Sequence, residues 1–274
     1  MSARATSATS GLGRVTVMAC VLSNGSGLSG GMSVVTAAHD AAAHLERSIR
    51  SVAEQTMPVG EHIIVDDGST DETAAVVEGL RRRFPHLVYI HQRRQGPAAA
   101  RNRGIEAASG RFIAFLDADD WWRPEKVEHQ VEFMRRTGVA FTYGDYEKHD
   151  GETGAFVTRY EMPESLGHAD FLDGCPIGCL TVAYDQVALG KRYMPHVRRG
   201  QDWGLWLALT RDGTRARKYP GNHAVYQENR GSLSSGKFRK TVDVFRIYRQ
   251  QEGFGFLPAA GYLCRHVINS RRGR

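Results

Sequence analysis

Residues 112–120 read Phe-Ile-Ala-Phe-Leu-Asp-Ala-Asp-Asp, and this stretch decides the class of fold. Its first five residues form a continuous apolar run, which is typical of a strand buried on both faces of a parallel sheet. The run leads directly into three carboxylates. Ligands of such sheets bind beyond the carboxyl ends of the strands. We therefore expect this acidic turn to line a binding cleft.

The alternation of short apolar runs with helical segments continues on both sides of this stretch. It predicts strands at 33–36, 62–65, 87–90 and 139–143, helices at 97–108, 124–136 and 165–172, and a hairpin at 146–160. Asp40 is expected to cap the helix that follows it, and Ser69 to Glu72 has the spacing of a capping box. The pattern indicates an α/β fold with a mostly parallel central sheet, helices on both faces, and a smaller, less regular second lobe.

Asp117 and Asp119 point to the same side of an extended turn, since alternate residues share a side. Two carboxylates placed in this way suit a divalent Mn²⁺ or Mg²⁺ that also binds substrate phosphates. A solvated acidic turn would give the same spacing. Spacing alone favours the solvated turn, and the position of the pair after a buried strand makes the two interpretations equal.

A second acidic pair, Asp66 and Asp67, follows the strand at 62–65 and precedes Gly68. Asp67 could accept hydrogen bonds from a nucleotide, and the glycine would allow close approach. The sequence Asp-Asp-Gly-Ser is also a good turn and helix cap. Because both acidic clusters end parallel strands, the expected fold brings them to one cleft.

An amphipathic helix is expected to begin near Gln201. Asp202 in its first turn is stabilised by the exposed backbone amides, which is a sufficient structural reason for a carboxylate there. An aspartate in a cleft could equally deprotonate an acceptor hydroxyl. Trp203 could stack on an acceptor sugar or lie in the core, and the core is favoured for Trp206.

Composition excludes several other classes of protein. The apolar runs are too short to span a bilayer as helices, and the eleven histidines form no His-Glu-x-x-His pattern. Motifs of serine hydrolases, P-loop enzymes and dinucleotide-dependent oxidoreductases are absent. The four cysteines (Cys20, Cys175, Cys179 and Cys264) have neither redox nor zinc-ligand spacing, which favours a reducing compartment such as the cytoplasm.

Five segments, in this order along the chain, together resemble family 2 glycosyltransferases of the GT-A fold, as found in bacterial cell-surface polysaccharide and O-antigen synthesis. The likeness covers about Ser33 to Ser234. The segments are residues 33–40, 63–71, 96–104 with an Arg-Asn-x-Gly pattern, 115–126 with the Asp-x-Asp motif, and 201–207, which is similar to the family's Glu-Asp-Trp-Asp-Leu-Trp-Leu run.

The resemblance implies an inverting hexosyltransferase that uses a nucleoside-diphosphate sugar, commonly a UDP-sugar. It implies that Asp117 and Asp119 bind Mn²⁺ or Mg²⁺ and that Asp202 is the general base. The residues implied in nucleotide-sugar binding are Ala37, His39, Asp67, Arg101 and Asp117. The weaker candidates for acceptor contact are Gln201 and Trp203.

The chain departs from the family pattern at several positions. His39 and Asp40 stand where Tyr-Asn is usual, Gln201 replaces the glutamate of the Glu-Asp pair, and Gly204 replaces the later aspartate. In the segment Tyr226 to Ser234, Gln227 and Asn229 stand where arginine and histidine are common. His223 is a weak substitute for a histidine metal ligand. These changes motivate an alternative, a catalytically inactive module that binds sugar nucleotides.

The positive charge is concentrated at the C-terminus. Residues 231–274 contain nine basic and two acidic side chains, a net +7 in a chain of net +6. Phe238, Val242 and Phe245 form an apolar stripe there, which could lie on an anionic membrane or pack on the domain. Nucleic-acid binding has only this charge in its favour, and we expect none.

The sequence predicts four segments. Residues 1–31 form an N-terminal extension, which is either disordered or the result of a start site assigned too far upstream. Residues 32–144 form the half that binds the nucleotide sugar, residues 145–234 the half that binds the acceptor and carries the base, and residues 235–274 a basic amphipathic tail. Val15 to Leu22 is followed by no good signal cleavage site. The expected location is the cytoplasm, at the membrane face if the acceptor is lipid-linked.

Overall fold

A ten-stranded sheet organises the chain in the computed structural model, which describes residues 31–229 and 237–271. Its main order is β3-β2-β1-β4-β9-β6-β10-β5, with β7 paired to β6 and β8 to β10. The strands are β1 Met32–Ala38, β2 Glu61–Asp66, β3 Leu87–His91, β4 Phe112–Phe115, β5 Trp121–Trp122, β6 Phe141–Asp150, β7 Phe156–Tyr160, β8 Ser165–Leu166, β9 Ala183–Asp185 and β10 Ala216–Glu228.

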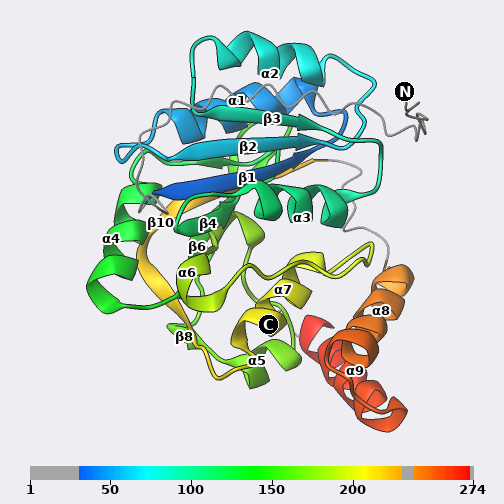
Figure 1. The fold of residues 1–274 in the computed structure, drawn as a ribbon. Coiled ribbons are helices and arrows are strands. Elements are labelled where there is room, and N and C mark those ends of the chain that lie inside the picture. Colours follow the sequence, from blue (N-terminus) through cyan, green and yellow to red (C-terminus); the bar gives the residue numbers. More distant parts are fainter. Residues whose placement is uncertain (1–30, 230–236, 272–274) are drawn as a thin grey trace, which may run out of the picture.

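The first four strands of this order, β3-β2-β1-β4, are parallel. Helices cover both of their faces, with α1 and α2 on one and α3 on the other (Figure 1). The helices are α1 Ala42–Ala53, α2 Thr73–Arg81, α3 Pro97–Ala107, α4 Lys126–Thr137, α5 His168–Leu172, α6 Gln186–Leu189, α7 Gln201–Thr210, α8 Lys237–Arg246 and α9 Phe256–Arg271, with a 3-10 turn η1 at Cys179–Thr181 and a π turn η3 at Ile247–Gln251.

Strands β1 and β4 are buried almost throughout, as their apolar runs predict. On β1, Val35 packs toward α3, and Ala38 packs toward α1 and α2. Helix α3 approaches β1 closely because residue 104 is glycine. A Cβ at Gly104 would overlap a methyl group of Val35. The glycine of the Arg-Asn-x-Gly pattern therefore sets the position of the helix that carries Arg101.

The two predicted helix caps do not form. Helix α1 has no side-chain cap of its own; Asp71 and Thr73 from the next loop accept the amides of Ala42 and Ala41. The carboxylate of Asp40 accepts the amide of Thr70 instead. Helix α2 starts only at Thr73, again without a side-chain cap. The capping prediction was wrong because the loops after β1 and β2 hydrogen-bond to each other.

Helix α7 is not amphipathic as expected. Eight of its ten residues are buried, and only Asp202 and Ala208 keep intermediate exposure. It packs against α5 and η3 and against the main core, so both of its faces are largely covered (Figure 1). The apolar residues that suggested a stripe belong to a helix buried all round.

The C-terminal elements pack against the domain through Val244 of α8, Ile247 and Tyr248 of η3, and Ala259 of α9. The Tyr248 hydroxyl donates to the carbonyl of Leu172 at the end of α5. The predicted stripe is therefore not one surface: Phe245 is partly buried, Val242 is 43% exposed, and the side chain of Phe238 lies outside the described residues.

Of residues 1–31, only Gly31 is described. None of the described helices is long and apolar enough to cross a membrane.

Candidate active site

Three carboxylates follow β4, and each has a different environment. Asp117 accepts a hydrogen bond from Arg101, Asp119 accepts one from the Asn229 amide at 2.9 Å, and Asp120 is 1% exposed and accepts the backbone amide of Gln227. The Ser48 hydroxyl of α1 donates to the Asp117 carbonyl. Asp120 therefore anchors the end of β10, whereas Asp117 and Asp119 keep partial exposure toward the cleft.

The electrostatics of this turn fit a divalent cation. Burial raises the pKa of Asp119, and the neighbouring Asp117 charge raises it further. Burial likewise raises the pKa of Asp120, with contributions from both neighbours. A bound cation would relieve this repulsion, and carboxylate oxygens are suitable ligands for Mn²⁺ or Mg²⁺. Within the described ranges no three His, Cys, Asp or Glu side chains gather as a metal site.

Arg101 joins this turn to helix α7. One guanidinium nitrogen lies 2.5 Å from Oδ1 of Asp117, and another donates to Oε1 of Gln201 at 2.9 Å. Desolvation lowers the pKa of Arg101, but Asp117 and Asp202 raise it, and the net shift is upward. The arginine is thus a permanent cation between the acidic turn and the start of α7.

Asp202 lies in the first turn of α7, which begins after Gly200 in the left-handed conformation (φ +74°). Burial raises the pKa of Asp202, while the Arg101 charge lowers it. The buried thiol of Cys179 also feels the charges of Asp117, Arg101 and Asp202, and burial raises its pKa well above the ordinary value. These four groups therefore share one site, although they come from four different elements.

The predicted nucleotide-side residues lie at the ends of β1 and β2. Asp67 is 4% exposed and accepts the Gln92 side chain and the backbone amides of Gln95 and Gly96, so it holds the start of α3 in place. The imidazole of His39 is 3.4 Å from the Asp40 carboxylate. Ala37 and His39 are both partly exposed. Their contact with a nucleotide stays a prediction.

The two tryptophans of α7 are core residues. Trp203 is 1% exposed and donates from Nε1 to the Phe171 carbonyl, and Trp206 is 0% exposed. The position of Trp203 does not favour acceptor stacking. At Gly204, a Cβ would clash with Pro195 and the Gln251 side chain, which donates to the Gly204 carbonyl. The C-terminal segment thus occupies the place where the family pattern has an aspartate.

Of the two candidates for a further metal ligand, only Asn229 lies beside the acidic turn. His223 contacts His129 at 2.9 Å and stacks on Tyr219, away from the acidic turn. The structure adds His44 of α1, which is 3.4 Å from the Gln227 amide and whose charge lowers the pKa of Asp119. No sequence signal identified His44, because a lone histidine on a helix carries no motif.

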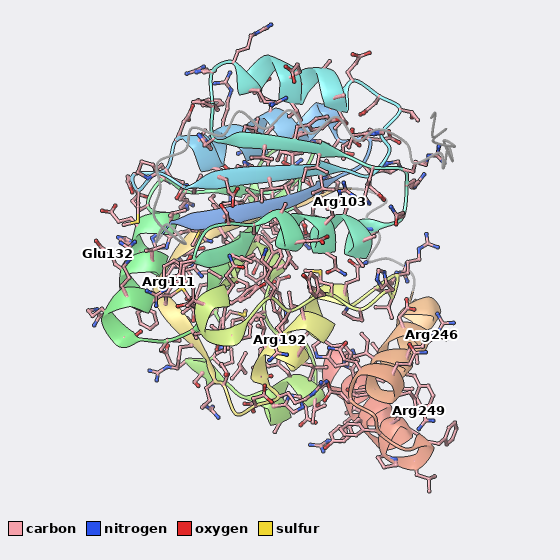
Figure 2. All side chains as sticks on the ribbon, viewed as in Figure 1. Arg103, Arg111, Glu132, Arg192, Arg246 and Arg249 are labelled. Atoms are coloured by element: carbon pink, nitrogen blue, oxygen red, sulfur yellow. The ribbon has the colours of Figure 1, made fainter. Side chains whose placement is uncertain are left out.

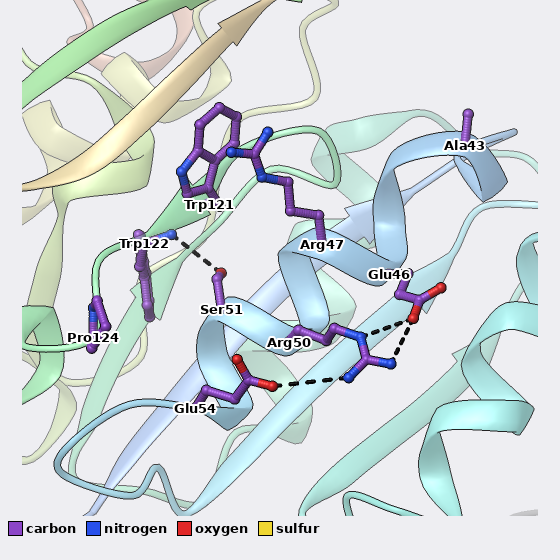
Figure 3. A pocket seen from close by; sticks show the side chains of 9 residues that line it. All are labelled: Ala43, Glu46, Arg47, Arg50, Ser51, Glu54, Trp121, Trp122 and Pro124. Carbon is purple, nitrogen blue, oxygen red and sulfur yellow. Dashed lines mark hydrogen bonds and ion pairs between the residues drawn. The ribbon is translucent and has the colours of Figure 1, made fainter. Parts of the chain in front are cut away.

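A hollow of about 570 Å³ lies on the other side of the acidic turn, between α1 and the two tryptophans of β5 (Figure 3). The guanidinium carbon of Arg47 lies 3.1 Å from the centre of the Trp121 ring. Arg50 is paired with Glu46 and Glu54. The hollow borders the acidic turn but does not contain its carboxylates, so it is separate from the candidate active site.

Replacing Gln201 with glutamate is expected to move the acid limb of the pH–activity profile to higher pH. A second negative charge beside Asp202 disfavours its ionised form and raises its pKa further, and the general base that the family resemblance implies for Asp202 must be ionised to act. Activity should therefore fall earlier on acidification than in the wild type. The measurement is kcat/KM against pH for both proteins. An unchanged acid limb would contradict the assignment of that limb to Asp202.

The family model described as "Glycosyl transferase family 2" matches residues 33–206. TuaG of Bacillus subtilis, named for teichuronic acid biosynthesis, is 35% identical over 89% of this chain and 97% of its own length. An Escherichia coli enzyme, UDP-Glc:alpha-D-GlcNAc-diphosphoundecaprenol beta-1,3-glucosyltransferase WfgD, is 34% identical over 76% of this chain and 81% of its own.

Solved structures confirm the GT-A fold that the sequence predicted. Residues 1–349 of S. aureus TarS, in complex with UDP-GlcNAc, superpose with a TM-score of 0.68 at 19% identity, over 86% of this chain and 71% of that one. The mannosyltransferase PcManGT of Pyrobaculum calidifontis, in complex with GDP-Man and Mn²⁺, has a TM-score of 0.62 at 19% identity, over 85% and 69% of the two chains.

Proposed function

Since the chain belongs to glycosyl transferase family 2 and is a glycosyltransferase of the GT-A fold, we propose that it transfers a sugar from UDP to a hydroxyl of a lipid-linked glycan, with inversion. One observation carries the proposal: Arg101 contacts both Asp117 of the acidic turn and Gln201 next to Asp202. A donor at the turn and a base on α7 would then face each other across one cleft.

The choice of UDP rests on the relatives. The E. coli relative is named for UDP-Glc, and the TarS structure contains UDP-GlcNAc. The nucleotide would lie at the carboxyl ends of β1 and β2, where Ala37, His39 and Asp67 end two neighbouring parallel strands. Asp67 would act there partly by fixing the loop before α3.

Asp117 and Asp119 would hold Mn²⁺ or Mg²⁺, which would neutralise charge on the departing diphosphate. The remaining chemistry is assigned to the chain's own residues. Asp202 would accept the proton of the acceptor hydroxyl as that oxygen attacks the anomeric carbon from the face opposite the leaving group. An α-linked donor would then give a β-linked product.

Arg101 would act as a positioning residue. Its guanidinium holds Asp117 in one orientation and, through Gln201, fixes the first turn of α7. Its charge also lowers the pKa of Asp202, which favours the ionised base against the effect of burial. The replacement of the family glutamate by Gln201 retains this hydrogen bond, so it does not by itself favour an inactive module.

A lipid-linked acceptor is proposed from two relatives named for GlcNAc-diphosphoundecaprenol acceptors, WfgD and a second E. coli enzyme, WfaP. Such an acceptor would place the protein at the cytoplasmic face of a membrane. The sugar and the linkage position depend on pocket details in the second lobe.

The test is turnover of UDP-, GDP- and dTDP-sugars with Mn²⁺ or Mg²⁺, with and without a synthetic GlcNAc-diphospho-lipid. We expect acceptor-dependent release of UDP and a product of inverted anomeric configuration by NMR. Turnover with only a GDP- or dTDP-sugar would overturn the donor assignment, and a product that retains the donor configuration would overturn the mechanism. Donor binding without turnover across an acceptor library would favour the inactive module.

Replacing Asp119 with asparagine is expected to weaken the Mn²⁺ dependence of transfer, with a loss of about 10²-fold or more in kcat/KM at limiting metal. One anionic ligand of two is removed, while the Asn229 contact can persist. The measurement is a metal titration of initial rates. Asp212→Asn, an exposed aspartate 75% accessible at its side chain, is the matched control. Equal metal curves for Asp119→Asn and the control would exclude Asp119 as a ligand.

A further inference from the structure

Helix α9 has two apolar faces, and only one of them packs on the domain. Ala259 and His266 are buried, with Tyr262 and Leu263 packed beside them against the core. On the opposite side Leu257 is 81% exposed and Ile268 is 48% exposed. A terminal helix that leaves large apolar side chains in water points to a further partner.

The exposed apolar residues of α9 form one stripe. At about 100° per residue, Leu257, Gly261, Cys264 and Ile268 fall within roughly 60° of arc and span about 16 Å along the helix. All four are exposed. Phe256, although 67% exposed, lies about 80° outside this arc, and its ring packs against that of Phe245. We call Leu257, Gly261, Cys264 and Ile268 the α9 stripe.

Helices α8 and α9 both carry a net positive charge. Helix α9 contains no acidic residue. The two acids of the C-terminal segment are buried in ion pairs, Asp243 with Arg246 and Glu252 with Arg211 and His168. Arg265 of α9 pairs with Asp173 at 2.7 Å but keeps 59% of its side-chain surface exposed, and Arg246 of α8, paired with Asp243, keeps 58% exposed. Figure 2 shows Arg246 of α8 and Arg249 of η3 in the C-terminal part of the chain, away from the central sheet.

We propose that the α9 stripe docks on an anionic lipid bilayer, with α9 lying in the plane of the surface. An apolar stripe bordered by basic side chains is typical of interfacial helices, which insert the apolar face and pair their charges with anionic headgroups. A second copy of the chain fits less well. The stripe has only two large side chains, Leu257 and Ile268, too few for a stable dimer interface, and a symmetric contact would bring like charges together.

This inference deepens the proposed function, since a lipid-linked acceptor gives the docking its purpose. The docking surface itself is argued from α9 alone and can be tested without a sugar donor. Failure of vesicle binding would therefore leave the transfer reaction untouched, and failure of transfer would leave vesicle binding to be judged by itself.

The experiment is flotation of the full chain with vesicles of phosphatidylcholine alone or with 40% phosphatidylglycerol. We expect binding to the anionic vesicles that weakens as salt rises, and a loss of about tenfold or more in Leu257→Asp/Ile268→Asp. Both side chains are exposed, so the melting temperature should be unchanged. Val88→Asp/Val187→Asp makes the same change of charge at two exposed valines elsewhere and should bind as the wild type does.

Three results would overturn the proposal. The first is no binding of the wild type to anionic vesicles, the second is equal binding to neutral and anionic vesicles, and the third is equal loss of binding in both double variants. Light scattering adds a further criterion. A wild-type dimer that Leu257→Asp/Ile268→Asp converts to a monomer, without vesicle binding by either protein, would assign the α9 stripe to a second copy of the chain.

Discussion

Replacing Asp202 with asparagine is expected to lower kcat by about 10²–10⁴-fold, the usual contribution of a positioned general base. Asparagine keeps the shape and the hydrogen bonds of the first turn of α7 but cannot accept the proton of the acceptor hydroxyl. Donor affinity should change by only about threefold, since the donor binds at the other side of the cleft. The measurements are initial rates with saturating acceptor and calorimetric titration with the UDP-sugar.

Asp212→Asn is the matched control, because it makes the same substitution in the turn after the other end of α7, at an exposed site. It should retain wild-type rates. Asp202→Asn should also unfold at or above the wild-type temperature, because burial raises the pKa of Asp202 and its ionised form destabilises the fold at neutral pH. Turnover within about threefold of wild type would exclude Asp202 as the base.

Replacing Arg101 with glutamine is expected to affect both turnover and stability. The change leaves Asp117 without its cation and removes a hydrogen bond to Gln201. Breaking a fully buried ion pair costs about 3–5 kcal/mol. Asp117 keeps 33% of its side-chain surface exposed, so we expect roughly 1–3 kcal/mol here. Urea unfolding measures this loss.

The effect of Arg101→Gln on turnover should be about 10²-fold or more, since both the acidic turn and α7 lose their common contact. Loss of the cation also raises the pKa of Asp202, so the acid limb of the pH–activity profile should move to higher pH. Arg101→Lys should recover the positive charge but not the hydrogen bonds to both Asp117 and Gln201. Its turnover should therefore lie between that of the wild type and that of Arg101→Gln. Arg103→Gln, two residues along α3, is the control (Figure 2). A pH profile that is the same in Arg101→Gln and in the control would contradict this role.

Much of the fold follows from local patterns. Strands β1 to β4 alternate with helices in the predicted order, because buried parallel strands are apolar throughout and can be recognised without their neighbours. The GT-A fold and the family were correctly inferred from the motifs. The errors concern residues whose partners are distant in sequence. Asp40 and Ser69 cap no helix, because the loops after β1 and β2 bond to each other across about 30 residues.

In the candidate site, too, local motifs predicted some residues, whereas other features depend on contacts that are distant in sequence. Motifs were enough to propose Asp117, Asp119 and Asp202 as site residues. Three other features depend on contacts across 16 to 110 residues. Arg101 joins Asp117 to Gln201, Asn229 rather than His223 lies beside Asp119, and Trp203 is buried. A sequence motif records the residue type that a site requires, but it does not record which side of that residue is covered.

By itself, then, the sequence determined the α/β architecture, the family and the order of the acidic motifs, because these depend on periodicity and on short spacings along the chain. Only the tertiary structure decided which apolar residues of the C-terminal helices are buried and which are exposed. Their apolar residues looked like one stripe centred on α8, but packing on α5 and α7 buries Val244 and Tyr248 and leaves Leu257 and Ile268 of α9 in water. Helical periodicity marks an apolar face, and only the neighbouring elements determine whether that face is covered.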